Sequence, residues 1–171
     1  AFEPTNEGYA IAKKHLYDLV RLARNQKGLN WTQLVLSNLY GPGDNFNPHS
    51  SHLLAAIINK VLAAERESES CIQIWGTGEP RREFTFVKDI SDWLLGFIVS
   101  EAESWPPSLN VGYGEDFSVK ELYELAARIV GWQGDFVPDP SRPDGAMDKL
   151  MDSTIARRHF GWSPKTDIQD G

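Results

Sequence analysis

The sequence predicts an α/β fold with a mainly parallel sheet. Two observations carry this prediction: short runs rich in β-formers alternate with longer runs of helical period, and they do so along the whole chain. The hydrophobic content of 41% is ordinary for a globular protein, and 171 residues suffice for one full domain or parts of two.

The first part of the chain reads as helix, strand, loop and helix. The predicted helix covers residues 9–26, where apolar residues recur at helical spacing and Gly28 serves as C-cap. Residues 31–40 are predicted to form one strand buried on both faces, since the segment is almost continuously apolar. Residues 41–51 form a loop, and Ser50 or Ser51 would cap a helix over 52–65.

The rest of the chain continues the alternation. Ser118 and Glu121 form a capping box, which marks the start of the strongest helix pattern in this part. Strands are predicted at 71–75, 82–87, 109–113 and 135–139, and helices at 90–103, 118–131 and 152–161.

Charge and composition exclude some functions. The net charge of −7 argues against a general nucleic-acid binder, which needs a basic face. Cys71 is the single cysteine, so no intrachain disulfide can form, which fits a reducing cytoplasm. No apolar run approaches the about 20 residues of a membrane span, and the sequence offers no metal-ligand motif. We therefore expect a cytoplasmic protein without metal, nucleic acid or membrane partners.

Tyr9 and Lys13 lie four residues apart and share one face of the first predicted helix. A nearby ammonium stabilises a phenolate, so such a pair can exchange protons near neutral pH. The spacing alone also fits two ordinary helix residues.

The sequence has no glycine-rich dinucleotide turn, because the pairs Gly76–Gly78 and Gly112–Gly114 do not lead from a strand into a helix with the required third glycine.

Four co-linear motifs carry a resemblance to a known family: EPTNEGYAIAK, NLYGPGDNFNPHSSH, IWGTGEPRREFTFVKD and RPDGAMDKLMD. Together they resemble the extended short-chain dehydrogenase/reductases, and within them the GDP-L-fucose synthases, which are GDP-4-keto-6-deoxymannose epimerase/reductases. The resemblance covers nearly the whole chain but only the second half of such an enzyme. The Gly-rich NADP(H) turn, the catalytic Ser or Thr and the epimerisation cysteine of that family are expected in a first half outside this sequence.

The resemblance implies a division into domains. Residues 1–44 would be the C-terminal part of a Rossmann-type NADP-binding domain with a doubly wound parallel sheet. Residues 45–171 would be mainly a smaller mixed α/β substrate-binding domain, with 88–113 packing back on the Rossmann sheet.

The resemblance also implies roles near the nicotinamide. Tyr9 would protonate the C4 oxygen of the sugar, and Lys13 would lower the pKa of Tyr9 and bind the nicotinamide ribose. Ser37, Asn38 and Leu39 would line the nicotinamide side of the cofactor, although the family usually has Pro-Thr where this chain has Leu-Ser.

His52 matches the epimerisation acid/base of the family and would also lie at the cofactor. A histidine in the first turn of a helix faces the positive end of the helix dipole, which favours the neutral imidazole. His49 is the local rival, and the residues alone do not choose between the two.

The resemblance assigns the GDP-sugar to Lys60, Trp75 and Arg82, with Asp144 and Lys149 as weaker candidates. Cations suit a diphosphate, although Lys60 stands where the family usually has Arg. Trp75 either packs on the ligand or fills the core. Arg81 should point to the opposite side of its strand from Arg82 and be solvated.

The implied activity is NADPH-dependent epimerisation at C3 and C5, and reduction at C4, of GDP-4-keto-6-deoxy-D-mannose to GDP-L-fucose by a homodimer. The alternatives are a related GDP-keto-sugar epimerase/reductase of the colitose or deoxyheptose type, or a non-catalytic nucleotide-sugar-binding module if the polypeptide is no longer than this.

Overall fold

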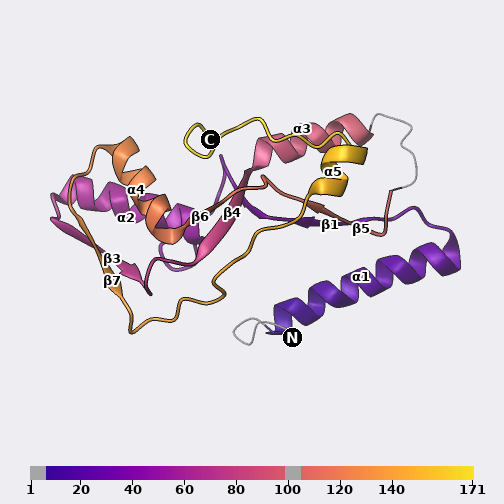
Figure 1. The fold of residues 1–171 in the computed structure, drawn as a ribbon, viewed down its shortest axis with the longest axis horizontal. Coiled ribbons are helices and arrows are strands. Elements are labelled where there is room, and N and C mark those ends of the chain that lie inside the picture. Colours follow the sequence, from indigo (N-terminus) through magenta and orange to yellow (C-terminus); the bar gives the residue numbers. More distant parts are fainter. Residues whose placement is uncertain (1–6, 99–104) are drawn as a thin grey trace.

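The computed structural model describes residues 7–98 and 105–171, and these residues form an α/β structure (Figure 1). Its helices are α1 (Glu7–Lys27), α2 (Leu53–Glu67), α3 (Val87–Ile98), α4 (Val119–Val130) and α5 (Thr154–His159). Its strands are β1 (Gln33–Leu36), β2 (Asn38–Tyr40), β3 (Cys71–Trp75), β4 (Arg81–Phe86), β5 (Ser108–Val111), β6 (Asp116–Ser118) and β7 (Asp135–Asp139).

Strand pairing in the described residues is mainly parallel, as the sequence predicts. β1 pairs with β5, β2 with β4 and β3 with β7, each pair in parallel. The exception is β6, which runs antiparallel to β4 and which the sequence analysis does not predict. The three small sheets are therefore β1–β5, β2–β4–β6 and β3–β7.

The prediction of one strand over 31–40, buried on both faces, is wrong in two respects. The chain changes partner at Ser37, from β5 to β4, where the Ser37 hydroxyl lies 2.6 Å from the Thr85 hydroxyl. Leu34 and Leu36 pack into the core, whereas Val35, on the opposite face, is 37% exposed. Alternation of side chains along a strand explains why one covered face leaves Val35 in solvent.

Helix α1 forms as predicted and ends at Gly28, whose φ of 66° suits glycine. It packs loosely: Val20 is its buried residue, and Leu19 is 62% exposed. Polar contacts attach it to β1 and to the segment before β5, since the Gln33 side chain donates to the Lys13 carbonyl at 3.3 Å and Arg24 donates to the Trp105 carbonyl at 2.7 Å. Because α1 and β1 run in opposite directions, the N-terminal turn of α1 lies toward the carboxyl end of β1 (Figure 1).

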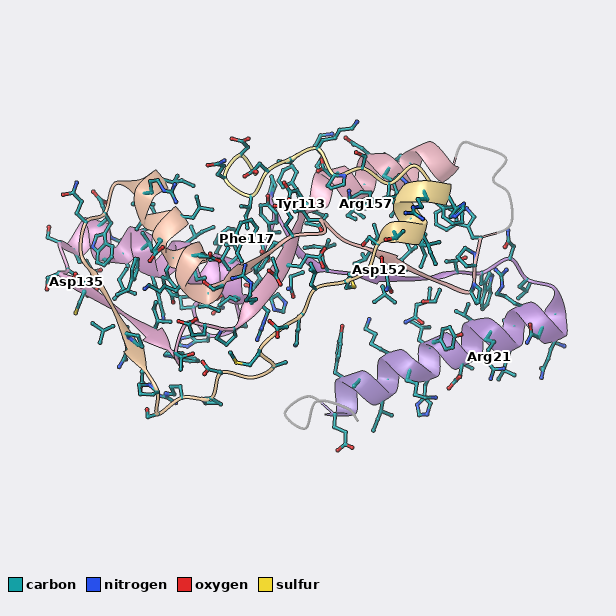
Figure 2. The ribbon with its side chains drawn as sticks, in the orientation of Figure 1. Arg21, Tyr113, Phe117, Asp135, Asp152 and Arg157 are labelled. Carbon is teal, nitrogen blue, oxygen red and sulfur yellow. The ribbon has the colours of Figure 1, made fainter. Side chains whose placement is uncertain are left out.

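Two hydrophobic clusters hold the molecule together, one toward each end. The first lies between α2, α4 and β3, and the second surrounds β5 and α5. Figure 2 shows Asp135 at the end of the first cluster, and Tyr113, Asp152 and Arg157 at the second, where Arg157 donates to the Tyr113 carbonyl. Fully buried members include Ile57, Val61, Ile74 and Leu122 in the first cluster, and Leu109, Val111, Ala156 and Trp162 in the second.

The helix termini test the capping predictions. The capping box of Ser118 and Glu121 is confirmed, with the Glu121 amide donating to the Ser118 hydroxyl at 3.0 Å. The Ser50 or Ser51 cap is wrong, because both serine amides donate to the Asn47 carbonyl in a turn and His52 is the N-cap of α2. Helix α3 begins three residues early, at Val87, and the predicted 99–103 lie outside the described residues. Helix α5 is shorter at both ends than the predicted 152–161.

Glu83, in the middle of β4, is fully buried and joins three segments. Its carboxylate accepts the amide of Gly114 at 2.7 Å and the amide of Met151 at 3.0 Å. Its carbonyl accepts the side-chain amide of Asn38 at 2.8 Å. A buried carboxylate is stable only when such donors satisfy its oxygens, so Glu83 fixes these segments relative to β4.

We predict that Glu83→Gln lowers the free energy of unfolding by about 2 kcal/mol, because one backbone amide loses its acceptor and faces an NH2 group. Urea denaturation followed by tryptophan fluorescence measures the change. Ser118→Ala is the control and should cost only about 1 kcal/mol. An unfolding free energy for Glu83→Gln equal to that of the wild type contradicts the assigned role.

Candidate functional site

A cavity of about 410 Å³ lies where β2, β4 and the start of α2 meet. Its lining combines polar and apolar side chains from segments far apart in the sequence. The lining residues are Asn38, Leu39, Asp44, His52, Leu53, Leu54, Arg82 and Phe84. Four residues predicted from the sequence, Asn38, Leu39, His52 and Arg82, therefore come together at one cavity.

The structure separates the two candidate histidines. His52 lines the cavity at the N-cap of α2, with an extended backbone and no side-chain capping bond, so its imidazole is not engaged in holding the helix. His49 lies outside the cavity lining, in the preceding turn, where its amide donates to the Asn47 side chain at 2.9 Å. Of the two histidines, His52 is therefore the one that the structure places at the cavity.

Side chains in the Ser37–Leu39 segment hold β2 on β4. The Ser37 hydroxyl bonds Thr85, which is fully buried, and the Asn38 amide bonds the Glu83 carbonyl. Leu39 and Asn38 still line the cavity. The segment can therefore present an ordered wall to a ligand, while Ser37 has a structural partner.

Arg82 and Arg81 point in different directions, as alternation predicts. Arg82 lines the cavity and donates to the Ala146 carbonyl at 2.7 Å, which holds the 140–150 loop on β4. Burial lowers the pKa of the Arg82 guanidinium, and the charges of Asp144 and Asp148 oppose this shift.

The prediction that Arg81 is simply solvated is wrong. Its guanidinium pairs with Asp116 at 2.7 Å and with Glu121 at 3.2 Å. These partners lie on β6 and α4, elements whose proximity to β4 the strand pattern did not reveal. Arg81 thus joins β4 to β6 and to the start of α4.

Lys60 and Trp75 form a contact of their own, separate from the cavity lining. The Lys60 ammonium lies 5.3 Å from the centre of the Trp75 ring and donates to the Gln73 carbonyl at 3.3 Å. Burial lowers the pKa of Lys60. Trp75 is 63% exposed, so of the two alternatives left open, filling the core is excluded.

The two weaker candidates behave differently. The Asp144 carboxylate accepts the Thr77 amide at 2.7 Å and the Thr77 hydroxyl at 3.0 Å, so it closes the 140–150 loop onto the turn between β3 and β4. Asp144 therefore has hydrogen-bond partners within the protein. Lys149 is exposed and does not line the cavity.

Tyr9 and Lys13 share a helix face as predicted, but they do not line the cavity. Tyr9 is 61% exposed, and the Lys13 ammonium lies over its ring, 5.3 Å from the centre. Their helix runs along β1 and β5, with the Tyr9 end toward the carboxyl end of β1 (Figure 1). The sequence did not indicate the other four cavity residues, Asp44, Leu53, Leu54 and Phe84, because no local pattern distinguishes them from a loop acid, apolar helix residues and a core aromatic.

Residues 1–112, more than half of the chain, match the model of the NAD dependent epimerase/dehydratase family. The chain belongs to this family. Among curated relatives, GDP-L-fucose synthase of Azorhizobium caulinodans is 43% identical over 170 residues, which are 99% of this chain and 54% of that protein. GDP-L-colitose synthase of Yersinia pseudotuberculosis is 38% identical over the same shares of both chains.

Solved structures share the fold of this epimerase/dehydratase chain. A GDP-mannoheptose C4 reductase from Campylobacter jejuni with NADP bound superposes with a TM-score of 0.75 at 30% identity, covering 91% of this chain and 51% of that one. The chain spans about half the length of the curated relatives it matches. Within residues 7–98 and 105–171, no helix has the length and apolar character needed to cross a membrane.

We predict that Asp144→Ala exposes the Thr77 amide, because that N–H loses its acceptor. Hydrogen exchange of the segment 76–79 should accelerate about tenfold or more, measured by mass spectrometry. Asp148→Ala removes a neighbouring carboxylate that accepts no such bond and should leave the exchange unchanged. Equal exchange in the wild type and Asp144→Ala contradicts the anchoring role.

Proposed function

We propose that this chain is the substrate-binding part of an NADP(H)-dependent oxidoreductase that epimerises and reduces GDP-4-keto-6-deoxy-D-mannose to GDP-L-fucose. The observation that carries the proposal is the single cavity that brings His52, Arg82 and the Asn38–Leu39 wall together. Relatives that carry GDP-L-fucose synthase and related names over the full length of this chain support the substrate class.

The residues present fit the nicotinamide end of the cofactor. Asn38 and Leu39 give one polar and one apolar side chain to a cavity wall that hydrogen bonds to β4 hold in place. NADPH, when bound, supplies the hydride that reduces C4 of the sugar.

We infer that residues 1–44 belong to the cofactor-binding domain and 45–171 mainly to the substrate domain. The pairing of β1 with β5 supports the inference that residues 88–113 pack on the cofactor-binding domain.

In this proposal, His52 is the acid/base that exchanges protons during the epimerisation. Carbons next to a ketone lose a proton readily, and a neutral imidazole can take that proton and return one from solvent. His52 lines the cavity at the N-cap of α2, and no side-chain capping bond occupies its imidazole. C3 and C5 flank the C4 ketone, so a histidine facing that end of the sugar can serve both.

Tyr9, with Lys13 beside it, donates the proton to the C4 oxygen during the reduction. Hydride addition leaves a negative charge on the C4 oxygen, and a phenol held by an ammonium can neutralise it. The exposed Tyr9 end of α1, directed toward the carboxyl end of β1, is consistent with a site completed by the part of the enzyme outside this chain.

The GDP moiety lies, in this proposal, toward Lys60, Trp75 and Arg82. A colitose- or heptose-forming reaction is the second candidate, favoured by the names of the Yersinia and Campylobacter relatives.

We further propose a cytoplasmic homodimer. The exposed apolar side chains of α1, among them Leu16 and Leu19, support an interface on that helix.

We predict that Tyr9→Phe in the full-length protein slows NADPH oxidation with GDP-4-keto-6-deoxymannose by about a hundredfold or more, because the C4 oxygen loses its acid. The decrease in NADPH absorbance measures the rate. Tyr17→Phe, two turns along the same helix, is the control and should keep full activity. Turnover of Tyr9→Phe close to that of the wild type refutes the role.

We predict that His52→Asn abolishes incorporation of solvent deuterium at C3 and C5, since the imidazole that exchanges these protons is gone. Mass spectrometry of the sugar nucleotide after incubation in D2O measures the incorporation. His49→Asn is the matched control and should exchange at the wild-type rate. Loss in His49→Asn instead of His52→Asn would transfer the role to His49.

A further inference from the structure

Asp44 is the one acidic side chain among the residues that line the cavity of about 410 Å³. It is half-buried and lies in the loop between β2 and α2, which leads to His52. The other polar side chains of the lining, Asn38, His52 and Arg82, each have a role in the proposal above. The carboxylate of Asp44 is the polar group of the cavity that the proposed reaction leaves without a role.

The Asp44 carboxylate keeps an oxygen available for a ligand. One oxygen accepts the Asn45 amide at 2.7 Å. Within residues 7–98 and 105–171, the other oxygen accepts no hydrogen bond, and the carboxylate forms no ion pair. Arg82, the cation of the same cavity, donates instead to the carbonyls of Arg81 and Ala146, each at 2.7 Å. The two opposite charges therefore line one cavity without pairing with each other.

The loop that carries Asp44 is held by bonds that do not involve the Asp44 side chain. The Asn45 side chain donates to the Ser50 carbonyl at 3.0 Å, which closes the loop on itself. The Asn59 side chain, on α2, donates to the Phe46 carbonyl at 2.7 Å, which attaches the loop to that helix. A side chain on such an anchored loop loses little conformational freedom when it binds a ligand. Replacement of Asp44 should also leave these bonds in place.

We infer that Asp44 is a further sugar-binding residue, whose carboxylate accepts a hydrogen bond from a hydroxyl group of the keto-sugar. This inference rests on the proposed function and specifies how the cavity recognises the sugar as distinct from the nucleotide. An ionised carboxylate is an acceptor only, and the hydroxyls of a sugar ring can donate to it. Hydrogen bonds to a charged acceptor are stronger than those between neutral groups.

The charges of the cavity give the ligand a direction. A diphosphate is repelled by a carboxylate and attracted by a guanidinium, so the phosphate end belongs toward Arg82 and the hydroxyls belong toward Asp44. Leu53 and Phe84 add apolar surface to the same lining. A mainly apolar wall with a few polar groups that fix orientation is typical of a small-ligand site, and it suits a sugar that has lost a hydroxyl.

The test compares the binding of GDP-4-keto-6-deoxymannose and of GDP to the full-length protein, by titration calorimetry without NADPH. Asp44→Ala should raise the Kd of the keto-sugar nucleotide about tenfold or more, because a hydroxyl loses a charged acceptor. The Kd of GDP should not rise, since GDP has no sugar to bind at Asp44. Asp44→Asn keeps a carbonyl oxygen as acceptor and should raise the Kd of the keto-sugar nucleotide by a smaller factor.

Glu65→Ala is the charge-matched control, because it removes an exposed carboxylate near the far end of α2. It should leave both Kd values unchanged. The loss of a negative charge alone favours an anionic ligand, so weaker binding by Asp44→Ala has to come from the lost hydrogen bond.

The outcomes are distinct. Binding of the keto-sugar nucleotide by Asp44→Ala as tight as that of the wild type overturns the inference and leaves the proposed function standing. An equal rise in both Kd values shows an effect on the nucleotide or on the fold, and it also overturns the inference. Failure of the wild type to bind GDP-4-keto-6-deoxymannose overturns the proposed function as well.

Discussion

The buried carboxylate of Glu83 is the constraint on which the rest of the site depends. The carboxylate accepts hydrogen bonds from the backbone amides of Gly114 and Met151, which belong to two separate segments. The backbone carbonyl of Glu83 accepts a hydrogen bond from the Asn38 side chain. The fit is close, because a Cβ on Gly112 would lie 2.2 Å from a Glu83 oxygen. A glycine at that position lets the turn after β5 reach the carboxylate.

Because side chains alternate along β4, neighbouring residues of this strand contact different parts of the molecule. Arg82 faces the cavity and holds the 140–150 loop, whereas Arg81 binds β6 and α4. The same loop places Asp144 on the turn after β3 and Arg142 on Trp75. One strand thus fixes both the cavity wall and the loop that approaches the proposed nucleotide site.

Sequence patterns predicted the features that depend on local residues. The helical period of α1, the capping box at Ser118 and the opposite directions of Arg81 and Arg82 all follow from neighbours within a few positions. The errors concern partners far along the chain. The break at Ser37 depends on Thr85, the ion pair of Arg81 depends on Asp116, and the anchoring of Asp144 depends on Thr77. The motifs did group Asn38, Leu39, His52 and Arg82, which the structure brings to one cavity, whereas Tyr9 and Lys13 lie outside that cavity in the described residues.

We propose that this chain supplies the substrate side of a GDP-keto-sugar epimerase/reductase. The most direct measurement is turnover of GDP-4-keto-6-deoxymannose with NADPH by the full-length protein, with the product identified by NMR. We expect stoichiometric NADPH oxidation and GDP-L-fucose as the product. Binding of the sugar nucleotide without any NADPH oxidation would contradict it.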